Sequence, residues 1–268
     1  MADGFARTTG KVGTFIVVPG PGLLNASAGL STAYACSSPV LAISGQIQSD
    51  LIGLGRGVLH EINNQMETIS AVCKQVERAM TPEDIPGMVH RAFRALHSGR
   101  PRPVEIEVPP DVLERIGDVT LLEPEAFSRA QADPDLLERA AQALGRAEHP
   151  LIVAGGGVQS SAAWAELRAL AEVLEAPVLM SANGRGALSD RDHRAFSGVG
   201  AASALLPKAD VVLAVGTRLA LVTFKPGTRI VQIDTDEREI GRNHKDTLGL
   251  VGDAVDNIPG VKGIGEKT

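Results

Sequence analysis

Two glycine-rich turns are the places where this sequence could bring main-chain amides close to a ligand. The first, PGPGLLN, holds Gly20, Gly22 and Asn25: the glycines let the backbone approach a flat ligand, and the asparagine amide can hydrogen-bond to its edge. The second, AGGGV, holds Gly156 and Gly157 before a serine-rich helix start, where N–H groups can face a diphosphate. A plain turn is the alternative for the first segment, and the second lacks the G-x-G-x-x-G pattern of dinucleotide sites.

Charged residues follow two predicted strands in the C-terminal half. Asp234 ends the run over residues 229–233, where a carboxylate could bind a ribose hydroxyl, and Arg218 follows the strand predicted over 211–215. Together with the second glycine turn, these residues could border a nucleotide. The alternative is that the glycines form tight β-to-α turns and that Asp234 caps a turn. The residues alone favour this structural interpretation.

The elements that must position these residues alternate between strand and helix along the chain. Continuous apolar runs, rather than alternating ones, indicate strands that are buried on both faces of a parallel sheet. We predict strands over residues 14–18, 39–43, 103–108, 151–154, 178–181, 211–215, 230–233 and 248–251. We predict helices from the first glycine turn to about residue 35, over 83–98 and over 161–175. This order predicts an α/β fold whose second half is a doubly wound, Rossmann-like sheet.

A change of composition divides the chain into two predicted domains. Residues 117–132 lose the apolar periodicity and mix Asp, Glu, Pro and Ser, as an interdomain linker does. Asp133 followed by Pro134 then predicts the start of a helix, with the aspartate as N-cap and the proline in the first turn. A length of 268 residues, with 44% hydrophobic and 22% charged residues, agrees with two globular domains.

Composition excludes several classes of protein. The formal net charge of −6 argues against a general nucleic-acid surface, which needs clustered Lys and Arg. No apolar run reaches about 18 residues and no basic segment precedes a short apolar one, so we expect neither a membrane span nor a signal peptide, and a cytoplasmic location by default. Cys36 and Cys73 have apolar neighbours and no metal-ligand spacing, so we interpret them as reduced core residues and expect no metal site.

Four segments, in order, resemble the pyrimidine-binding domain of one enzyme superfamily. They are MADGFARTTG at residues 1–10, the PGPGLLN turn, SGQI at 44–47 and SGRPRPV at 98–104. The superfamily uses thiamine diphosphate (ThDP) and includes acetolactate synthase, benzoylformate decarboxylase and oxalyl-CoA decarboxylase. Residues 133–251, with AGGGV, GTRLA and VQIDTDEREIGRN, are similar to its central domain, which binds FAD in acetolactate synthase and ADP in oxalyl-CoA decarboxylase. The resemblance implies an incomplete, parallel-sheet pyrimidine-type domain over residues 1–116 and a Rossmann-like central domain after the linker.

The resemblance also assigns roles to the residues of the turns and strand ends. By position, Gly20, Gly22 and Asn25 would lie near the ThDP pyrimidine, and Gln46 and Lys74 would lie near the substrate. The residues of the second glycine turn and of the two later strand ends would border FAD or ADP.

The intact relatives that the resemblance implies need more than these residues. They bind ThDP and Mg²⁺ between domains of two subunits of a homo-oligomer, and they decarboxylate or carboligate 2-oxo acids. The glutamate that activates ThDP corresponds to a position upstream of Met1, and the domain that holds the metal and the diphosphate follows the central domain. We therefore expect the 268 residues alone neither to bind ThDP nor to catalyse the reaction. The alternative from another class is a nucleotide-binding or purely structural module.

Residues 252–268 resemble a different family, the helix-hairpin-helix segment of five-prime nucleases of the bacterial DNA polymerase I type. Asp253 and Asp256 could be metal carboxylates, and Gly263 and Gly265 could turn N–H groups towards a DNA phosphate. Two-metal chemistry needs more ligands, so a DNA-binding or nuclease fragment is an alternative that we do not favour. We expect an unstructured extension that does not bind DNA, joined at a seam that is natural, designed or artefactual.

Overall fold

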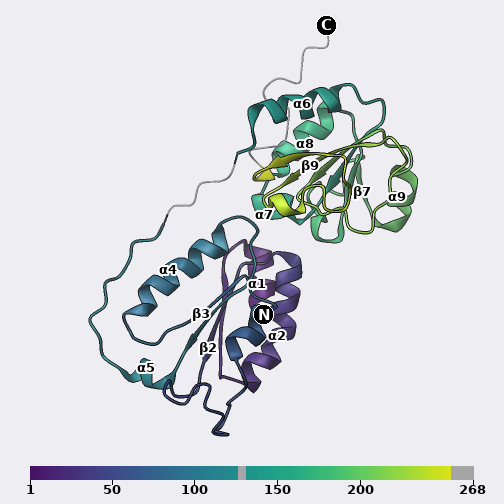
Figure 1. The fold of residues 1–268 in the computed structure, drawn as a ribbon. Coiled ribbons are helices and arrows are strands. Elements are labelled where there is room, and N and C mark those ends of the chain that lie inside the picture. Colours follow the sequence, from purple (N-terminus) through teal and green to yellow (C-terminus); the bar gives the residue numbers. More distant parts are fainter. Residues whose placement is uncertain (126–130, 255–268) are drawn as a thin grey trace. The chain divides into compact units, whose positions relative to one another are not determined.

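The chain forms two α/β units, each built on a parallel sheet (Figure 1). The computed structural model describes residues 1–125 and 131–254. The two units divide within the predicted linker, and residues 117–125 contain neither helix nor strand. The fold class predicted from the sequence is confirmed.

Unit 1 is a four-stranded parallel sheet with the strand order β1-β2-β4-β3. Its strands are β1 (Gly13–Val17), β2 (Val40–Gly45), β3 (Gln75–Arg78) and β4 (Val104–Val108), and its helices are α1 (Ala2–Thr9), α2 (Pro21–Cys36), α3 (Gln65–Ser70), α4 (Asp84–His97) and α5 (Pro110–Glu114). Helices α1, α2 and α3 pack on one face of the sheet, and α4 packs on the other (Figure 1).

Strand β4 lies inside this sheet and carries two kinds of side chain. Val104, Ile106 and Val108 pack against α4, as a strand buried on both faces requires. Because successive side chains point to opposite faces, Glu105 and Glu107 point towards the other helices, and both are fully buried at 0% exposure. Carboxylates are almost never buried without partners, so this strand marks the polar centre of unit 1.

Strand β1 is at the edge of the sheet, and one of its faces is uncovered among the described residues. Phe15 and Val17 pack towards α1 and α2. The alternate residues Thr14 and Ile16 are exposed, with Ile16 at 75%. Helix α4 covers the same face of β2, β3 and β4 but does not extend over β1.

Unit 2 is a six-stranded parallel sheet with the strand order β10-β9-β8-β5-β6-β7. Its strands are β5 (Pro150–Ala154), β6 (Val178–Met180), β7 (Ala195–Ser197), β8 (Val211–Val215), β9 (Arg229–Asp234) and β10 (Thr247–Val251), and its helices are α6 (Pro134–Gly145), α7 (Gly156–Ser161), α8 (Trp164–Val173) and α9 (Gly198–Leu205), with 3₁₀ turns η1 (Ala182–Gly184) and η2 (Glu237–Glu239). Helices α6, α7 and α8 cover one face, and α9 covers the other. The strand order reverses between β5 and β8, as in Rossmann-like sheets.

Most elements agree with the sequence predictions. Every predicted strand overlaps an observed one, and the N-cap at Asp133 is confirmed, because its side chain accepts the N–H of Asp135 at 2.8 Å. The helix predicted over 161–175 corresponds to α8, which is separated from α7 at Ala162, a residue in the left-handed region with φ 55°. Strands β3 and β7 and helices α1, α3, α5 and α9 were not predicted, and all of them are short.

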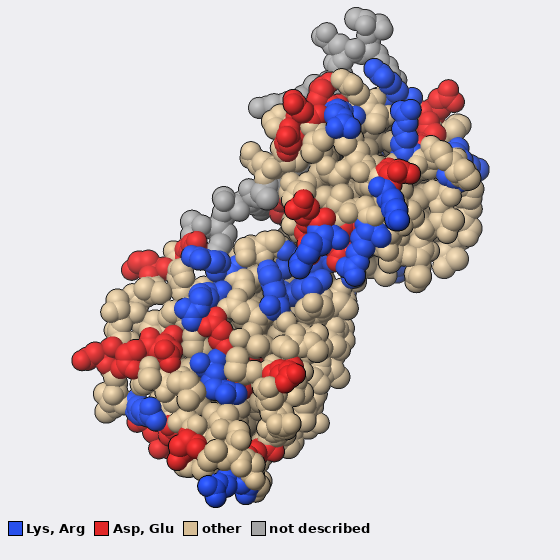
Figure 2. All heavy atoms as spheres, in the orientation of Figure 1, with Lys and Arg blue, Asp and Glu red and all other residues tan. Residues whose placement is uncertain are grey.

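Both signs of charge occur on the face of the molecule shown in Figure 2, where each unit carries Lys and Arg as well as Asp and Glu side chains. Over residues 1–125 and 131–254, no helix combines the length and the hydropathy needed to cross a bilayer. Residues 255–268, which include most of the nuclease-like segment, lie outside the described residues.

Candidate functional site

The carboxyl ends of the four strands of unit 1 meet at one side of the sheet, which we call the unit 1 edge. The turn with Gly20 follows β1, Gln46 follows β2, Arg78 ends β3, and Glu107 lies one residue before the end of β4. In open parallel sheets, ligands bind at this kind of edge. The structure therefore places the first glycine turn and Gln46 at the same edge of the sheet.

The two glycines of the first turn are required by packing. Gly20 has a φ of +56°, and a Cβ there would lie 2.2 Å from the carbonyl oxygen of His60. A Cβ on Gly22 would lie 2.5 Å from Cγ2 of Val18. Asn25 is exposed in the second turn of α2, so its amide is available to a ligand. The glycines shape the turn, and the turn and the Asn25 amide together could contact one side of a flat heterocycle.

Gln65 ties the glycine turn to the sheet. It is the first residue of α3, which Asn64 caps, and it is only 1% exposed. Its Oε1 accepts the N–H of Gly20 at 2.8 Å, and its Nε2 donates to Oε2 of Glu107 at 2.7 Å and to the carbonyl of Gly45 at 3.0 Å. One amide therefore fixes the turn after β1 against the ends of β2 and β4.

Glu107 is the acceptor that several side chains share. Arg78 donates to it from β3 in an ion pair, and Gln46 Nε2 lies 3.3 and 3.4 Å from its two carboxylate oxygens. The Oε1 of Gln46 accepts the N–H of Ile47 at 2.7 Å. Gln46 is only 7% exposed, and its side chain points into the protein. Gln46 and Gln65 thus meet at one buried carboxylate.

Glu105 is a second buried carboxyl group on the same face of β4. Its Oε1 accepts the hydroxyl of Ser44 at 2.5 Å, and its Oε2 has no hydrogen-bond partner. Burial raises the pKa of Glu105 to about 8, the Ser44 hydrogen bond opposes this rise, and the nearby charge of Glu107 adds to it. Burial, followed by the charge of Glu105, raises the pKa of Cys73 to about 12. Both shifts favour the protonated forms of Glu105 and Cys73.

Lys74 is not part of the unit 1 edge. It immediately precedes β3, and because the strands are parallel this position lies at the opposite, amino end of the sheet. Its ammonium donates to the carbonyls of Ala95, Ser98 and Arg100 at 2.7, 2.6 and 3.1 Å, where it satisfies the end of α4. Lys74 and Gln46 therefore lie at opposite ends of the sheet of unit 1, and the prediction that both lie near the substrate stays a prediction.

The glycines of the second turn also serve close packing. A Cβ on Gly155 would lie 2.2 Å from the carbonyl oxygen of Gly216, and one on Gly157 would lie 2.5 Å from its Cα. The N–H of Gly157 donates to that carbonyl at 3.1 Å. Gly156 instead faces Asn183, whose Cβ would lie 3.2 Å away from an added Cβ. The turns after β5 and β8 are thus in backbone contact at the point where the strand order reverses.

Asp234 and Arg218 lie at neighbouring strand ends of unit 2 but differ in exposure. Asp234 is 4% exposed, and its Oδ1 accepts the N–H of Asp236 at 3.0 Å, as a turn cap does. Arg218 is exposed, and its carbonyl accepts the side-chain amide of Asn243 at 2.7 Å. The turn-cap alternative therefore describes the Asp234 carboxylate well, and Arg218 is the more accessible of the two.

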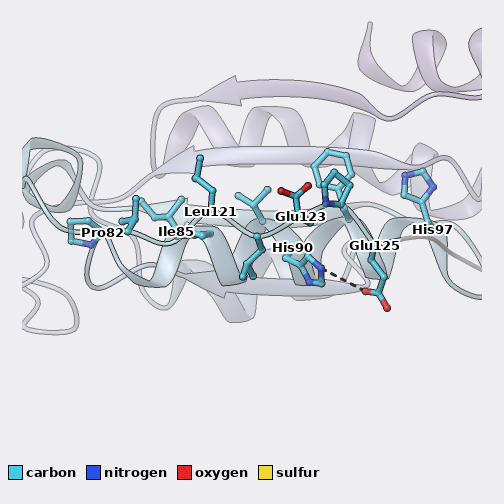
Figure 3. A pocket seen from close by; sticks show the side chains of 13 residues that line it. Pro82, Ile85, His90, His97, Leu121, Glu123 and Glu125 are labelled. Carbon is cyan, nitrogen blue, oxygen red and sulfur yellow. Dashed lines mark ion pairs between the residues drawn. The ribbon is translucent and has the colours of Figure 1, made fainter.

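A separate apolar groove of about 790 Å³ runs along the outer face of α4, between this helix and residues 119–125 (Figure 3). Among its lining residues, Glu125 lies 3.8 Å from Nε2 of His90, and it also accepts Nε of Arg94, which does not line the groove, at 2.7 Å. The groove is on the side of the sheet away from Glu107. In the part of the chain that the structure describes, no three His, Cys, Asp or Glu side chains are placed to hold a metal ion.

Comparison with known proteins relates both units to one family. Residues 1–68 match the N-terminal TPP binding domain of thiamine pyrophosphate enzymes, and residues 137–259 match their central domain. The chain is 34% identical over 271 residues to a probable acetolactate synthase large subunit of Methanocaldococcus jannaschii, with 94% of the chain and 45% of the relative covered. It is 35% identical over 264 residues to a probable 2-ketoarginine decarboxylase of Pseudomonas aeruginosa, with 95% and 47% covered.

A solved structure shares this two-unit fold. Benzoylformate decarboxylase from Polynucleobacter necessarius superposes with a TM-score of 0.86 at 23% identity, over 96% of this chain and 50% of that one. The chain therefore belongs to the superfamily of ThDP-dependent enzymes that includes acetolactate synthase, and it contains sequence of the N-terminal and central domains. It spans about half the length of the curated relatives that it matches.

The comparisons give no support to the nuclease interpretation of residues 252–268. The match to the central domain continues to residue 259, so the first part of this segment falls within the thiamine pyrophosphate enzyme pattern. In the structure, the N–H of Gly252 donates to the carbonyl of Asp234 at 2.9 Å, which joins the residue after β10 to the end of β9.

The raised pKa of Glu105 predicts how the stability of unit 1 depends on pH. Because this pKa rises from 4.5 to about 8 on folding, the folded chain keeps a proton that the unfolded chain releases between these values. The free energy of unfolding should therefore fall by roughly 2 to 4 kcal/mol as the pH rises from about 4.5 to about 8. Glu105→Gln, which preserves the shape of the neutral acid, should remove this dependence.

Urea unfolding across this pH range provides the measurement. The single Tyr34 reports on unit 1, and the single Trp164 reports on unit 2 as an internal control. We expect the Tyr34 transition of the wild type to weaken with pH relative to that of Glu105→Gln, while the Trp164 transition is the same in both. Parallel pH profiles for the two Tyr34 transitions would show that Glu105 is ionised in the folded chain.

Proposed function

We propose that this chain forms the N-terminal and central part of a ThDP-dependent enzyme that decarboxylates or carboligates a 2-oxo acid as a homo-oligomer. The observation that carries the proposal is the order of the two domain matches, at residues 1–68 and 137–259, along one chain. The names of the relatives support the substrate class, since 2-ketoarginine is a 2-oxo acid. We propose that residues outside these 268 supply the group that activates ThDP and the ligands of its Mg²⁺.

The unit 1 edge would form one wall of the cofactor site. ThDP, once bound, supplies a nucleophilic carbon and stabilises the carbanion that decarboxylation leaves. The proposed role of this chain is to place the Gly20 turn and the exposed Asn25 amide against the pyrimidine ring. Gln65 and Glu107 hold that turn in place from below. Rigid positioning of this kind lowers the entropy that is lost on binding.

The complete polypeptide encoded by the reading frame provides the test. Release of CO₂ from pyruvate, benzoylformate and other 2-oxo acids should be saturable and should require both ThDP and Mg²⁺. Gly20→Ala should reduce turnover by at least about tenfold, because its Cβ would meet the His60 carbonyl and displace the turn. Gly29→Ala is the matched control, since this glycine lies in α2 with no heavy atom within 4 Å of its Cβ position.

Two results would contradict the proposal. One is the absence of ThDP-dependent release by the complete polypeptide with every 2-oxo acid in the panel. The other is clear saturable decarboxylation by the 268 residues alone, which we expect to be inactive because they would form only one wall of the site.

A second candidate function is nucleotide binding by unit 2. It is favoured by one observation, the reversal of strand order between β5 and β8, which places the turn with Gly156 beside the turn with Arg218. Doubly wound sheets bind nucleotides at such a point. ADP and FAD are the ligands to consider, and we expect weak binding, because the two turns already fill part of the crevice with backbone.

Calorimetry with ADP and with FAD tests this candidate. Arg218→Ala should weaken binding by at least about tenfold, since a guanidinium is a strong phosphate partner. Arg229→Ala is the control, because this exposed arginine begins β9 at the opposite, amino end of the sheet. No heat with either nucleotide up to millimolar concentration would leave unit 2 a structural domain.

A further inference from the structure

We infer that Glu107 is the positioning residue of the unit 1 edge: its carboxylate orients Gln46 and Gln65, and these two amides hold the main chain on which a cofactor would rest. The inference rests on the proposed function for the identity of the ligand. The positioning itself is a property of the chain without cofactor. It concerns contacts among described residues of unit 1 only.

Each amide is held at both ends. The Nε2 of Gln65 donates to Glu107 at 2.7 Å while its Oε1 accepts the N–H of Gly20 at 2.8 Å. The Nε2 of Gln46 lies 3.3 and 3.4 Å from the same carboxylate while its Oε1 accepts the N–H of Ile47 at 2.7 Å. A carboxylate can only accept, so both NH₂ groups must face it. Both amide oxygens are then directed at the main chain.

The charge of Glu107 is what the arrangement requires. Arg78 donates to the carboxylate in addition to the two amides, so three side chains use its two oxygens. A glutamine at this position would keep one acceptor oxygen and turn an NH₂ group towards the other donors. At least one buried donor would lose its acceptor. The loss of a buried hydrogen bond costs more free energy than the loss of a solvent-exposed one.

Glu105 provides a matched contrast on the same strand and the same face. It is equally buried, but only the Ser44 hydroxyl donates to it and its Oε2 has no hydrogen-bond partner. Gln65 Nε2 also donates to the Ser44 hydroxyl at 3.2 Å, so Glu105 reaches Gln65 through one side chain. A glutamine at position 105 keeps the oxygen that Ser44 uses and therefore removes no shared acceptor. A difference between the two glutamine variants isolates the network from the general effect of changing a buried glutamate.

Amide hydrogen exchange of the cofactor-free, isotope-labelled chain, resolved by NMR, is the experiment. In Glu107→Gln, the amides of Gly20 and Ile47 should exchange at least about fivefold faster, because the side chains that accept them are no longer oriented. The amides of Ile106 in β4 and Leu213 in β8 should be unchanged. In Glu105→Gln at neutral pH, Leu213 should be unchanged, and Gly20 and Ile47 should exchange no faster than in the wild type, because this variant removes only the ionisation of residue 105.

Glu107→Gln could unfold unit 1, in which case the Ile106 amide would also exchange faster. Two further variants then distinguish positioning by Glu107 from general unfolding. Glu107→Asp keeps the charged acceptor and should restore at least part of the protection of Gly20 and Ile47. Gln65→Met removes one amide and should accelerate Gly20 while leaving Ile47 protected. Rescue by aspartate together with this selective effect would support positioning.

Unchanged exchange of Gly20 and Ile47 in Glu107→Gln would overturn the inference, as would equal acceleration of Gly20, Ile47 and Ile106 in Gln65→Met. Failure of the proposed function is distinguishable from both results. It would appear as absent ThDP-dependent turnover in the complete polypeptide, whereas the exchange pattern is measured without cofactor.

Discussion

Two buried carboxyl groups on one strand are the constraint on which unit 1 depends. Glu105 and Glu107 lie two residues apart on the same buried face of β4, and among the described residues only Glu107 has an ion pair, with Arg78. Burial of two charges beside one counter-charge would be very costly. The chain avoids this cost by keeping Glu105 protonated and by surrounding Glu107 with donors.

The two units use the carboxyl ends of their strands in different ways. In unit 1, side-chain hydrogen bonds connect the strand ends, and Gln65 links the Gly20 turn to Glu107 near the end of β4. In unit 2, the turns after β5 and β8 touch directly, since Gly155 and Gly157 pack on Gly216. The first arrangement leaves an exposed amide, Asn25, at the edge, whereas the second leaves little room between the turns.

The sequence predicted the parts of the fold that depend on apolar runs. Long buried strands such as β8 and a capped helix such as α6 have strong local patterns, and both were found. The strand β3, with the sequence QVER, has no such pattern, and missing it left no basis for placing Lys74 at the amino end of the sheet. The role of Gln65 depends on contacts across 42 and 45 residues of chain, which no local pattern encodes. The one available signal was Glu-Ile-Glu inside an otherwise apolar strand.

The charge state of this edge can be observed directly by carbon NMR of the glutamate side chains in the full chain. Glu105→Gln assigns the resonance of Glu105, and Glu107→Gln assigns its neighbour. The account predicts that Glu105 has the chemical shift of a neutral acid at neutral pH and titrates near a pKa of about 8. A carboxylate shift for Glu105 at neutral pH, with titration at the ordinary value of 4.5, would contradict it, because two charged carboxylates would then be buried on one face of β4 with an ion pair to Glu107 alone among the described residues.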